Sequence, residues 1–334
     1  MFKRSVRISL LAASLSVCIN TSSFAAQNGY AEHEKAKVLV EEMVKEHGFD
    51  RAVLIDLFRG AEKKDKILEA IARPAEKTLE WAQYRKIFLT EDRIEQGKKF
   101  LKTHAEPLAR AEKTMGVPKE IITAIIGVET RYGKHKGSYR VLDALSTLAF
   151  DYPPRSSFFT SELKQALLLA REQGFDMREM KGSYAGAMGY GQFIASSYRH
   201  YAIDFDADNI VDILNNPIDA IGSVANYFVK HKWLAGQPVA FPLAKDSLGK
   251  NFEKLIHSNL KPAHRLQELK IQGVTLPKGL DMNAMGKIQQ FEGEQGTEYW
   301  LTLDNFYVIT RYNHSHLYAM AAFHLAKELG LPEK

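Results

Sequence analysis

The sequence predicts a mainly α-helical protein with a small β domain toward its C-terminal end. Apolar residues recur every three or four positions through residues 32–115, and residues 117–235 form a second helical block punctuated by Pro and Gly. Beyond Trp233 the pattern alternates and is rich in β-branched and aromatic residues. This change predicts four to five short strands between residues 268 and 310.

Residues 1–26 have the features of a secretory signal peptide. The stretch begins "MFKRSVR", continues with an apolar run over residues 8–19, and ends in the small-residue site Ser23-Phe24-Ala25. The run is shorter than the roughly 18 apolar residues that a membrane-spanning helix needs, so we expect an exported, periplasmic protein. The alternative is an outer-membrane lipoprotein anchored through Cys18, which the bulky residue before this cysteine disfavours.

The overall charge argues against nucleic acids as partners. The net charge is +5, and the signal peptide carries three basic and no acidic residues, which leaves +2 for the exported chain. This mild excess argues against a nucleic-acid-binding protein, whose basic face usually shows in the total charge. It is compatible with an anionic polymer. Cys18 is the only cysteine, so the exported chain would form no disulfide.

Two further segments are placed by their local pattern. Pro74 is predicted to end a helix, and Trp81 and Tyr84 then lie in a segment that we expect to be extended. These aromatic residues would serve either as anchors that pack onto a neighbouring helix or as platforms for a sugar. The last helix is predicted over residues 316–329.

The stretch "GVPKEIITAIIGVETRYG" (residues 116–133) predicts a helix that ends on a glutamate. Pro118 suits the first helical position and Gly133 a left-handed cap, so Glu129 falls in the last turn. Its apolar neighbours and the negative end of the helix dipole both disfavour ionisation, so we expect a raised pKa for the Glu129 carboxyl. A carboxyl that is protonated near neutral pH can act as a general acid. The alternative is a glutamate that turns to solvent or pairs with Arg131.

The glycine-rich stretch "GSYAGAMGYGQF" (residues 182–193) suggests a ligand-binding loop. It lacks the glycine spacing of a nucleotide loop, and no Lys-Ser/Thr pair follows it. Small residues let a long ligand approach the backbone closely, and Ser183 and Gln192 offer polar contacts. The alternative is close packing of helices.

The acidic stretch "DFDADNIVDILNNPID" (residues 204–219) has the spacing of an EF-hand calcium loop. Loop positions 1, 3, 5, 7 and 9 are filled by Asp204, Asp206, Asp208, the carbonyl of Ile210, and Asp212. Two positions depart from the pattern, because Asn209 replaces the usual glycine and Asn215 replaces the usual bidentate glutamate. The alternative is a solvated acidic turn.

Five separated strings carry a resemblance to a known family. The strings "GVETRYG", "LDALSTLAFDYPPRSSFF", "GSYAGAMGYGQFIASSY", "DAIGSVANYF" and "YVITRYNHSHLYAM" resemble, in the same order, motifs of the membrane-bound lytic murein transglycosylase B family. The resemblance covers about residues 73–318. It implies a lysozyme-like helical core at residues 111–236, flanked by a helical domain at 27–110 and an antiparallel β domain at 237–304, with residues 305–334 returning to the core.

The resemblance also implies an activity and its residues. The family cleaves the MurNAc–GlcNAc bond of peptidoglycan without water, leaves a 1,6-anhydro-MurNAc end, and needs no cofactor for the chemistry. Glu129 matches the catalytic acid, and Asp219 is implied as the late carboxylate of a structural Ca²⁺ site. The implied glycan contacts are Arg155, Ser183, Gln192, Phe193, Tyr227, Tyr312, Asn313 and Tyr318. Pro154 stands where relatives carry a second arginine, which puts one contact in doubt.

The expected partners are glycan strands and proteins of cell-wall synthesis or remodelling, and we expect a monomer. One carboxyl suffices for the non-hydrolytic route, because Glu129 can protonate the leaving oxygen and then accept the proton of the muramyl C6 hydroxyl. Two other functions stay open. A hydrolase of the goose-lysozyme kind would use water as the acceptor, and an inactive peptidoglycan-binding protein would use no catalytic acid.

Overall fold

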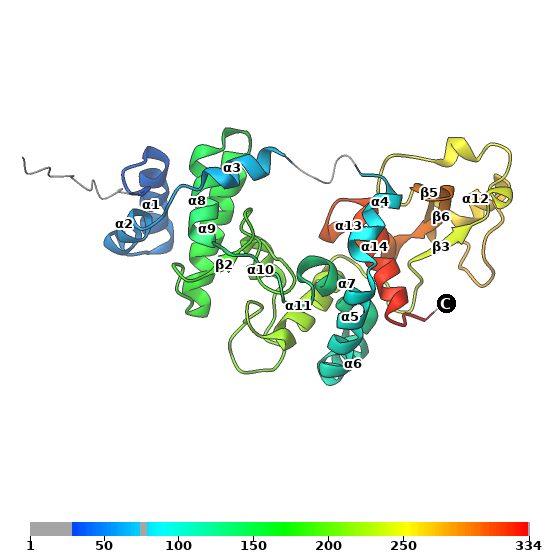
Figure 1. Cartoon of the computed structure of the whole chain (residues 1–334), viewed down its shortest axis with the longest axis horizontal. Coiled ribbons are helices and arrows are strands. Elements are labelled where there is room, and N and C mark those ends of the chain that lie inside the picture. Colours follow the sequence, from blue (N-terminus) through cyan, green and yellow to red (C-terminus); the bar gives the residue numbers. More distant parts are fainter. Residues whose placement is uncertain (1–28, 74–78, 333–334) are drawn as a thin grey trace, which may run out of the picture.

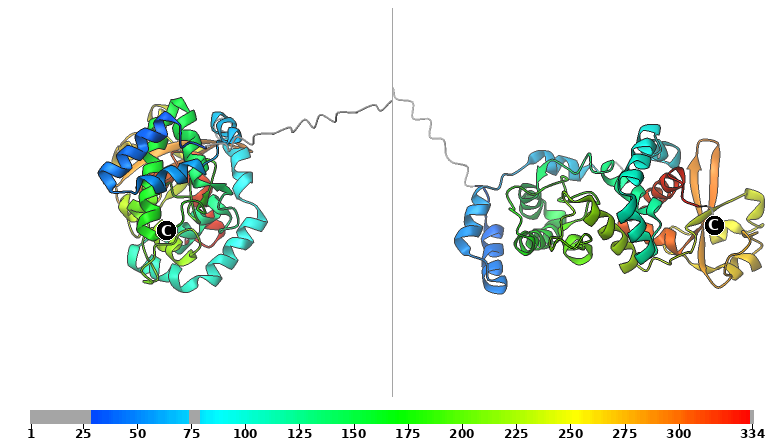
Figure 2. Two further views of the ribbon diagram at one scale, coloured as in Figure 1. Left: turned by 90° about the vertical axis from the view of Figure 1, so that its left-hand side faces the viewer. Right: turned by 90° about the horizontal axis from the view of Figure 1, so that it is seen from below.

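The computed structural model describes residues 29–73 and 79–332. The predicted signal peptide, Cys18 and Pro74 lie outside these residues. The molecule is elongated, with helices α1 (Glu34–His47) and α2 (Arg51–Arg59) at one end, other helices in the middle and a β-sheet at the opposite end (Figure 1). The view from below keeps the same order along the long axis (Figure 2). Among the described residues, none of the helices combines the length and the apolar composition that a membrane-spanning helix needs.

The N-terminal helices begin at side chains that cap free backbone N–H groups. The His33 ring accepts a hydrogen bond from the backbone of α1, and the Asp50 carboxylate accepts two from the backbone of α2. Before residue 116, the described part of the chain continues with α3 (Asp65–Ala72), α4 (Trp81–Phe88), α5 (Glu91–Thr103) and α6 (Ala105–Met115).

The prediction of an extended segment around Trp81 and Tyr84 is wrong, because both residues lie in α4. Both side chains are buried, and the Trp81 ring packs against the rings of Phe291 and His324. The interpretation of these aromatic residues as packing anchors is therefore confirmed. A buried ring of this size contributes several kcal/mol, on the order of 3–5, to stability.

The middle of the molecule is built around two helices that are buried on nearly all sides, α7 (Lys119–Thr130) and α8 (Val141–Asp151). Their sequences are apolar on most faces, as such burial requires, and Asp143 and Thr147 of α8 are buried polar exceptions that accept backbone N–H groups of Glu62 and Lys64. The surrounding elements are β1 (Tyr139–Arg140), the short 3₁₀ helix η2 (Pro153–Arg155), α9 (Ser156–Gln173), β2 (Lys181–Gly182), α10 (Ala195–Tyr201) and α11 (Pro217–Lys230).

The sheet is antiparallel with strand order β3-β6-β5-β4, which confirms a small β domain. The strands are β3 (Ala240–Leu243), β4 (His264–Arg265), β5 (Met285–Gly293) and β6 (Gly296–Leu303). A two-residue turn joins β5 to β6 in register. Buried Ile288 and Leu301 belong to an apolar cluster separate from that of the helices, so this domain has a core of its own.

The number of strands predicted between residues 268 and 310 is wrong. Only β5 and β6 lie there, because the predicted range begins within the helix α12 (Leu266–Ile271) and ends within the helix α13 (Asp304–Tyr312). The last predicted helix is confirmed as α14 (His316–Glu328). Helices α13 and α14 carry the chain from the sheet back to the middle, where α14 lies beside α4 and α7 (Figure 1).

Candidate active site

Glu129 lies in the last turn of α7, as the sequence predicts. Its side chain is partly exposed at the end of a helix whose preceding turns are buried. Arg131, Tyr132 and Gly133 have left-handed backbone conformations and end the helix abruptly. Helix α7 begins at Lys119, so Pro118 is its N-cap rather than its first residue.

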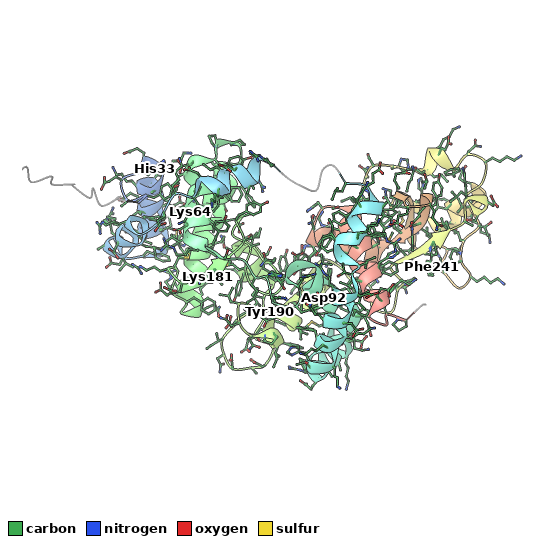
Figure 3. The ribbon with its side chains drawn as sticks, in the orientation of Figure 1. His33, Lys64, Asp92, Lys181, Tyr190 and Phe241 are labelled. Carbon is green, nitrogen blue, oxygen red and sulfur yellow. The ribbon has the colours of Figure 1, made fainter. Side chains whose placement is uncertain are left out.

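Thr130 fixes the end of α7 to the glycine-rich loop. Its hydroxyl donates to the carbonyl of Ile126 and to the carbonyl of Tyr190, at 3.1 and 2.9 Å, and accepts the N–H of Gly133. In Figure 3, Tyr190 lies near the middle of the long axis. It stands between the half of the molecule that contains α8 and α9 and the helix α5, which carries Asp92. Thr130 is fully buried, so this connection holds the glutamate's helix and the loop in one arrangement.

The Glu129 carboxylate accepts a hydrogen bond from Tyr318 of α14. The Tyr318 hydroxyl lies 2.5 Å from Oε1 of Glu129, across 189 positions of sequence. The ring of Tyr312 lies parallel to that of Tyr318, with 6.5 Å between their centroids, and its hydroxyl donates to the carbonyl of Gly191. The two tyrosines therefore link the glutamate, the C-terminal helices and the glycine-rich loop.

Burial raises the pKa of Tyr312 and of Tyr318 well above the ordinary value, and the negative charge of Glu129 raises both further. Both phenols therefore stay protonated near neutral pH and remain hydrogen-bond donors. A donor on Oε1 orients the carboxyl group, as a reacting acid requires.

An aromatic wall continues from Tyr312. The rings of Phe193 and Tyr227 lie 5.8 and 4.7 Å from the Tyr312 ring, and the Tyr227 hydroxyl donates to the carbonyl of Arg311. Tyr201 and His231 extend the wall, since both rings contact Tyr227. Clustered aromatic faces and phenol groups are typical of sites that bind sugars and other ligands with one apolar face.

Internal hydrogen bonds hold the glycine-rich loop (residues 182–193) in a defined conformation. The Ser183 hydroxyl accepts the N–H groups of Ala185 and Ala187, and Gln192 has a φ of 50° with its amide donating to the carbonyls of Lys136 and Gly189. At Gly191 an added Cβ would lie 2.7 Å from the Tyr312 hydroxyl. A side chain at this position would therefore displace the tyrosine that supports Tyr318.

The remaining predicted contacts lie on other elements. Arg155 ends η2 at the surface, and its guanidinium lies over the rings of Phe158 and Phe159 at 4.3 and 5.1 Å. Asn313 follows α13, and its carbonyl accepts the N–H of Ser315, the cap of α14. Direct contacts link Glu129 to Tyr318, and ring contacts link Tyr318 through Tyr312 to Phe193 and Tyr227. Arg155, Ser183 and Asn313 take no part in these contacts.

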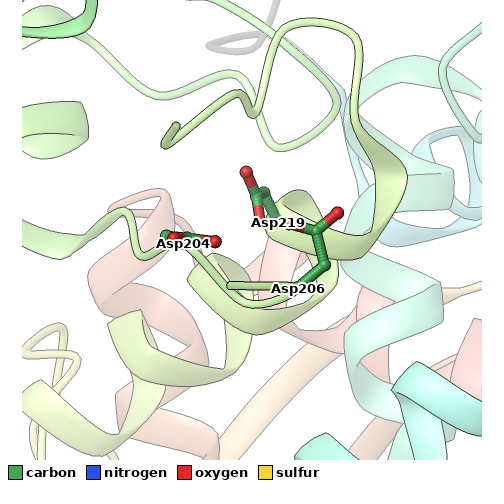
Figure 4. Close-up of side chains that lie close together, drawn as sticks. All are labelled: Asp204, Asp206 and Asp219. Carbon is green, nitrogen blue, oxygen red and sulfur yellow. The ribbon is translucent and has the colours of Figure 1, made fainter. Parts of the chain in front are cut away.

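The acidic stretch places three carboxylates together. Oxygens of Asp204, Asp206 and Asp219 lie within 4.8 Å of one another, and Figure 4 shows Asp219 reaching them from the start of α11. Asp219 is fully buried, and this burial raises its pKa, although its two oxygens accept the N–H groups of Phe205 and Asp212.

Three converging carboxylates, one of them buried, are an oxygen donor set of the kind that calcium prefers. Ala207 and Asn209 have left-handed conformations, as the sharp turn requires. The other predicted ligands hold the loop itself. Asp208 accepts the N–H of Ile210, and Asp212 accepts those of Leu214 and Asn215.

Sequence reasoning missed Thr130, Tyr201 and His231. A buried threonine one residue after Glu129 gives no signal of its own, because the contact that joins it to the glycine-rich loop is made with a carbonyl 60 positions away. Tyr201 and His231 stand at the ends of ordinary helical segments. Their contact with Tyr227 depends on how α10 and α11 pack.

Comparison with known proteins identifies the family. Residues 31–327 match the model of the transglycosylase SLT domain. The chain is 40% identical over 311 residues to membrane-bound lytic murein transglycosylase B of Escherichia coli strain K12, which covers 90% of this chain and 84% of that protein. This chain belongs to the family of transglycosylases with an SLT domain.

Solved structures of relatives agree with the fold. Soluble lytic transglycosylase SltB1 from Pseudomonas aeruginosa is 49% identical, with a TM-score of 0.83 over 88% of this chain and 98% of that one. The E. coli lytic transglycosylase Slt35 in complex with calcium is 39% identical, with a TM-score of 0.81 over 92% and 97%. SltB3 from P. aeruginosa, in complex with NAG-NAM-pentapeptide, is 31% identical, with a TM-score of 0.79 over 88% and 78%. The predicted class, a lysozyme-like helical core with a small β domain, is confirmed.

Proposed function

We propose that this chain is a lytic murein transglycosylase that cleaves the MurNAc–GlcNAc β-1,4 bond of peptidoglycan and leaves a 1,6-anhydro-MurNAc end. The observation that carries the proposal is Glu129, which ends a buried helix with Oε1 held by the Tyr318 hydroxyl. Membership in a family of transglycosylases supports it. The chain is accordingly an enzyme that acts on a polysaccharide and needs no cofactor for the chemistry.

Glu129 acts twice in this reaction. Its carboxyl first gives a proton to the oxygen that leaves with GlcNAc, while the bond between that oxygen and C1 of MurNAc breaks. The resulting carboxylate then takes the proton of the C6 hydroxyl as that oxygen bonds to C1. The carboxyl ends the cycle protonated, so no second acid is consumed. The N-acetyl group of the sugar can stabilise the positive charge between the two steps.

The residues around Glu129 would hold the glycan. Tyr312 is half-buried and offers a ring edge or face, whereas Phe193 and Tyr227 are buried and pack against it. The loop with Ser183 and Gln192 offers close backbone approach. Arg155, at the end of η2, would contact a more distant sugar, whereas Asn313 directly follows Tyr312 at the end of α13 and would contact the glycan beside it. The complex of the relative SltB3 with a peptidoglycan fragment supports glycan strands as the partner.

A structural calcium ion fits the acidic loop. Asp204, Asp206 and Asp219 would hold it, with the carbonyl of Ile210 and the carboxylates of Asp208 and Asp212 as further predicted ligands. The calcium complex of the relative Slt35 supports this assignment. The ion would fix the loop before α11 and would take no part in the reaction, since Glu129 supplies the proton transfers.

The place of action follows from the substrate. Peptidoglycan lies outside the cytoplasmic membrane, so the exported chain would act in the periplasm after cleavage of residues 1–26. The alternative is attachment to a membrane through Cys18, which requires cleavage before this cysteine instead of after residue 26; the name of the E. coli relative supports it. The domain boundaries after residues 110, 236 and 304 remain part of the proposal.

Substitution Glu129→Gln tests the assignment. The amide keeps the shape of the side chain and its contact with Tyr318 but cannot transfer a proton, so release of muropeptides from purified sacculi should fall by a factor of at least about 1,000. Circular dichroism should show the wild-type fold. Near wild-type release by the variant would refute the role of Glu129.

A further inference from the structure

Two histidines of the β domain face each other through their ring nitrogens. The Nε2 atoms of His257 and His264 lie 3.2 Å apart, so that one can donate a hydrogen bond to the other, and their ring planes differ by 31°. Both side chains are partly buried. They belong to the domain with its own core, at the far end of the molecule from α1 and α2 (Figure 1), so the reaction at Glu129 does not use them.

Contacts with β5 set the distance between the two rings. Ile256, just before His257, forms a parallel bridge with Ile288, and His264 pairs with Gly286 two positions earlier on the same strand. The loop between the histidines is tied down in its middle as well, because the buried Lys287 amine donates to the carbonyl of Asn259. Three consecutive residues of β5 therefore hold both ends and the interior of residues 257–264.

A carboxylate lies on the opposite side of His264. Oε2 of Glu268 is 3.8 Å from Nδ1 of His264, and the same oxygen accepts the N–H of Arg265. The contact is longer than a hydrogen bond, but the charge of the carboxylate favours the tautomer of His264 that carries its proton on Nδ1, with the lone pair of Nε2 toward His257. Histidines that bind metals usually have such a carboxylate on their second nitrogen, which orients the ring and makes it a stronger ligand.

We propose that His257 and His264 form a binding site for a divalent transition metal of the zinc class, apart from the acidic loop. Zinc–nitrogen bonds of about 2.0–2.1 Å in tetrahedral geometry place two ligand nitrogens about 3.3 Å apart, close to the separation found here. Imidazole nitrogens suit zinc, nickel and copper, whereas calcium prefers oxygen. Water would complete the coordination, and the ion would clamp residues 257–264 against β5.

Calorimetric titration with zinc chloride tests this proposal. The exported chain is used without a histidine tag, in saturating calcium so that the acidic loop is occupied, and at about pH 8, where free imidazole is neutral. The wild type should bind one zinc ion at this site. His257→Gln and His264→Gln should each lower the zinc affinity at least about tenfold, and Glu268→Gln should lower it about tenfold.

His47→Gln is the matched control, because His47 lies at the end of α1, far from the β domain. This variant should keep the wild-type zinc affinity. Circular dichroism should show that every variant is folded, so that a loss of affinity reports on the ligands. The proposal would be overturned if the wild type took up no zinc at millimolar concentration. It would also be overturned if His257→Gln and His264→Gln both kept the wild-type zinc affinity.

Discussion

At the scale of single residues, Glu129 depends on a tyrosine that reaches it from the C-terminal helix. The Tyr318 hydroxyl donates to Oε1 of Glu129 at 2.5 Å, and Tyr318 is buried. Because burial keeps the phenol protonated whether or not Glu129 carries a charge, this donor persists at the pH of the reaction. Tyr318 therefore fixes the direction in which the carboxyl presents its proton.

Removal of this hydroxyl should slow the reaction without unfolding the protein. A hydrogen bond to a charged group contributes about 1.5–3 kcal/mol, so Tyr318→Phe should lower turnover of sacculi by roughly 10- to 100-fold. Tyr198→Phe is the matched control, since its hydroxyl is also buried but donates to the carbonyl of Val211. The control should keep wild-type turnover. Equal turnover in the two variants would show that Tyr318 does not orient the acid.

The sequence predicts part of this site on physical grounds. The position of Glu129 in the last turn follows from Pro118, the apolar run and Gly133, although the structure caps the helix at Arg131, two residues before that glycine. Tyr312 and Tyr318 were available only through the family resemblance, because two tyrosines on neighbouring helices carry no local signal of a shared partner. Neither the local pattern nor the family resemblance indicated Thr130, because its role depends on a carbonyl 60 positions away.

At the scale of secondary structure, two segments contradict their local pattern. Trp81 and Tyr84 lie in α4, and the β-branched and aromatic run before Tyr312 forms α13. β-propensity mostly reflects how side chains fit a half-buried surface, and both helices find such surfaces by packing beside α14. Tertiary contacts therefore decide these elements, whereas α1, α7 and α14 follow directly from helical periodicity.

The acidic loop should make stability depend on calcium. Saturation at about 100 times the dissociation constant adds roughly 2.7 kcal/mol to the free energy of unfolding, so thermal melting with calcium should lie above melting with a chelator. Asp206→Ala should remove most of this difference, because Asp206 belongs to the group of three carboxylates. Asp281→Ala, at an exposed acid of the β domain, should keep it. Coincident melting curves for the wild type with and without calcium would leave only a solvated acidic turn.

At the scale of the whole molecule, the site is assembled from segments far apart in sequence. The chain builds α7 and the glycine-rich loop, leaves to form the sheet, and returns through α13 and α14 to place Tyr312 and Tyr318 beside Glu129. The sheet thus lies between the two halves of the site in sequence. The order of helical and β regions could be predicted from composition, but this return could not, because it is a long-range contact without a local pattern.

Digestion of sacculi in heavy-oxygen water, followed by mass spectrometry of the released muropeptides, tests the central claim most directly. If Glu129 passes the proton of the C6 hydroxyl and that oxygen closes on C1, the positioned internal attack outruns a diffusing water molecule. The products should then be anhydro-muropeptides, lighter by one water than hydrolysed ones and without label at the muramyl end. Predominantly labelled reducing ends would contradict this account and identify the enzyme as a hydrolase of the lysozyme kind.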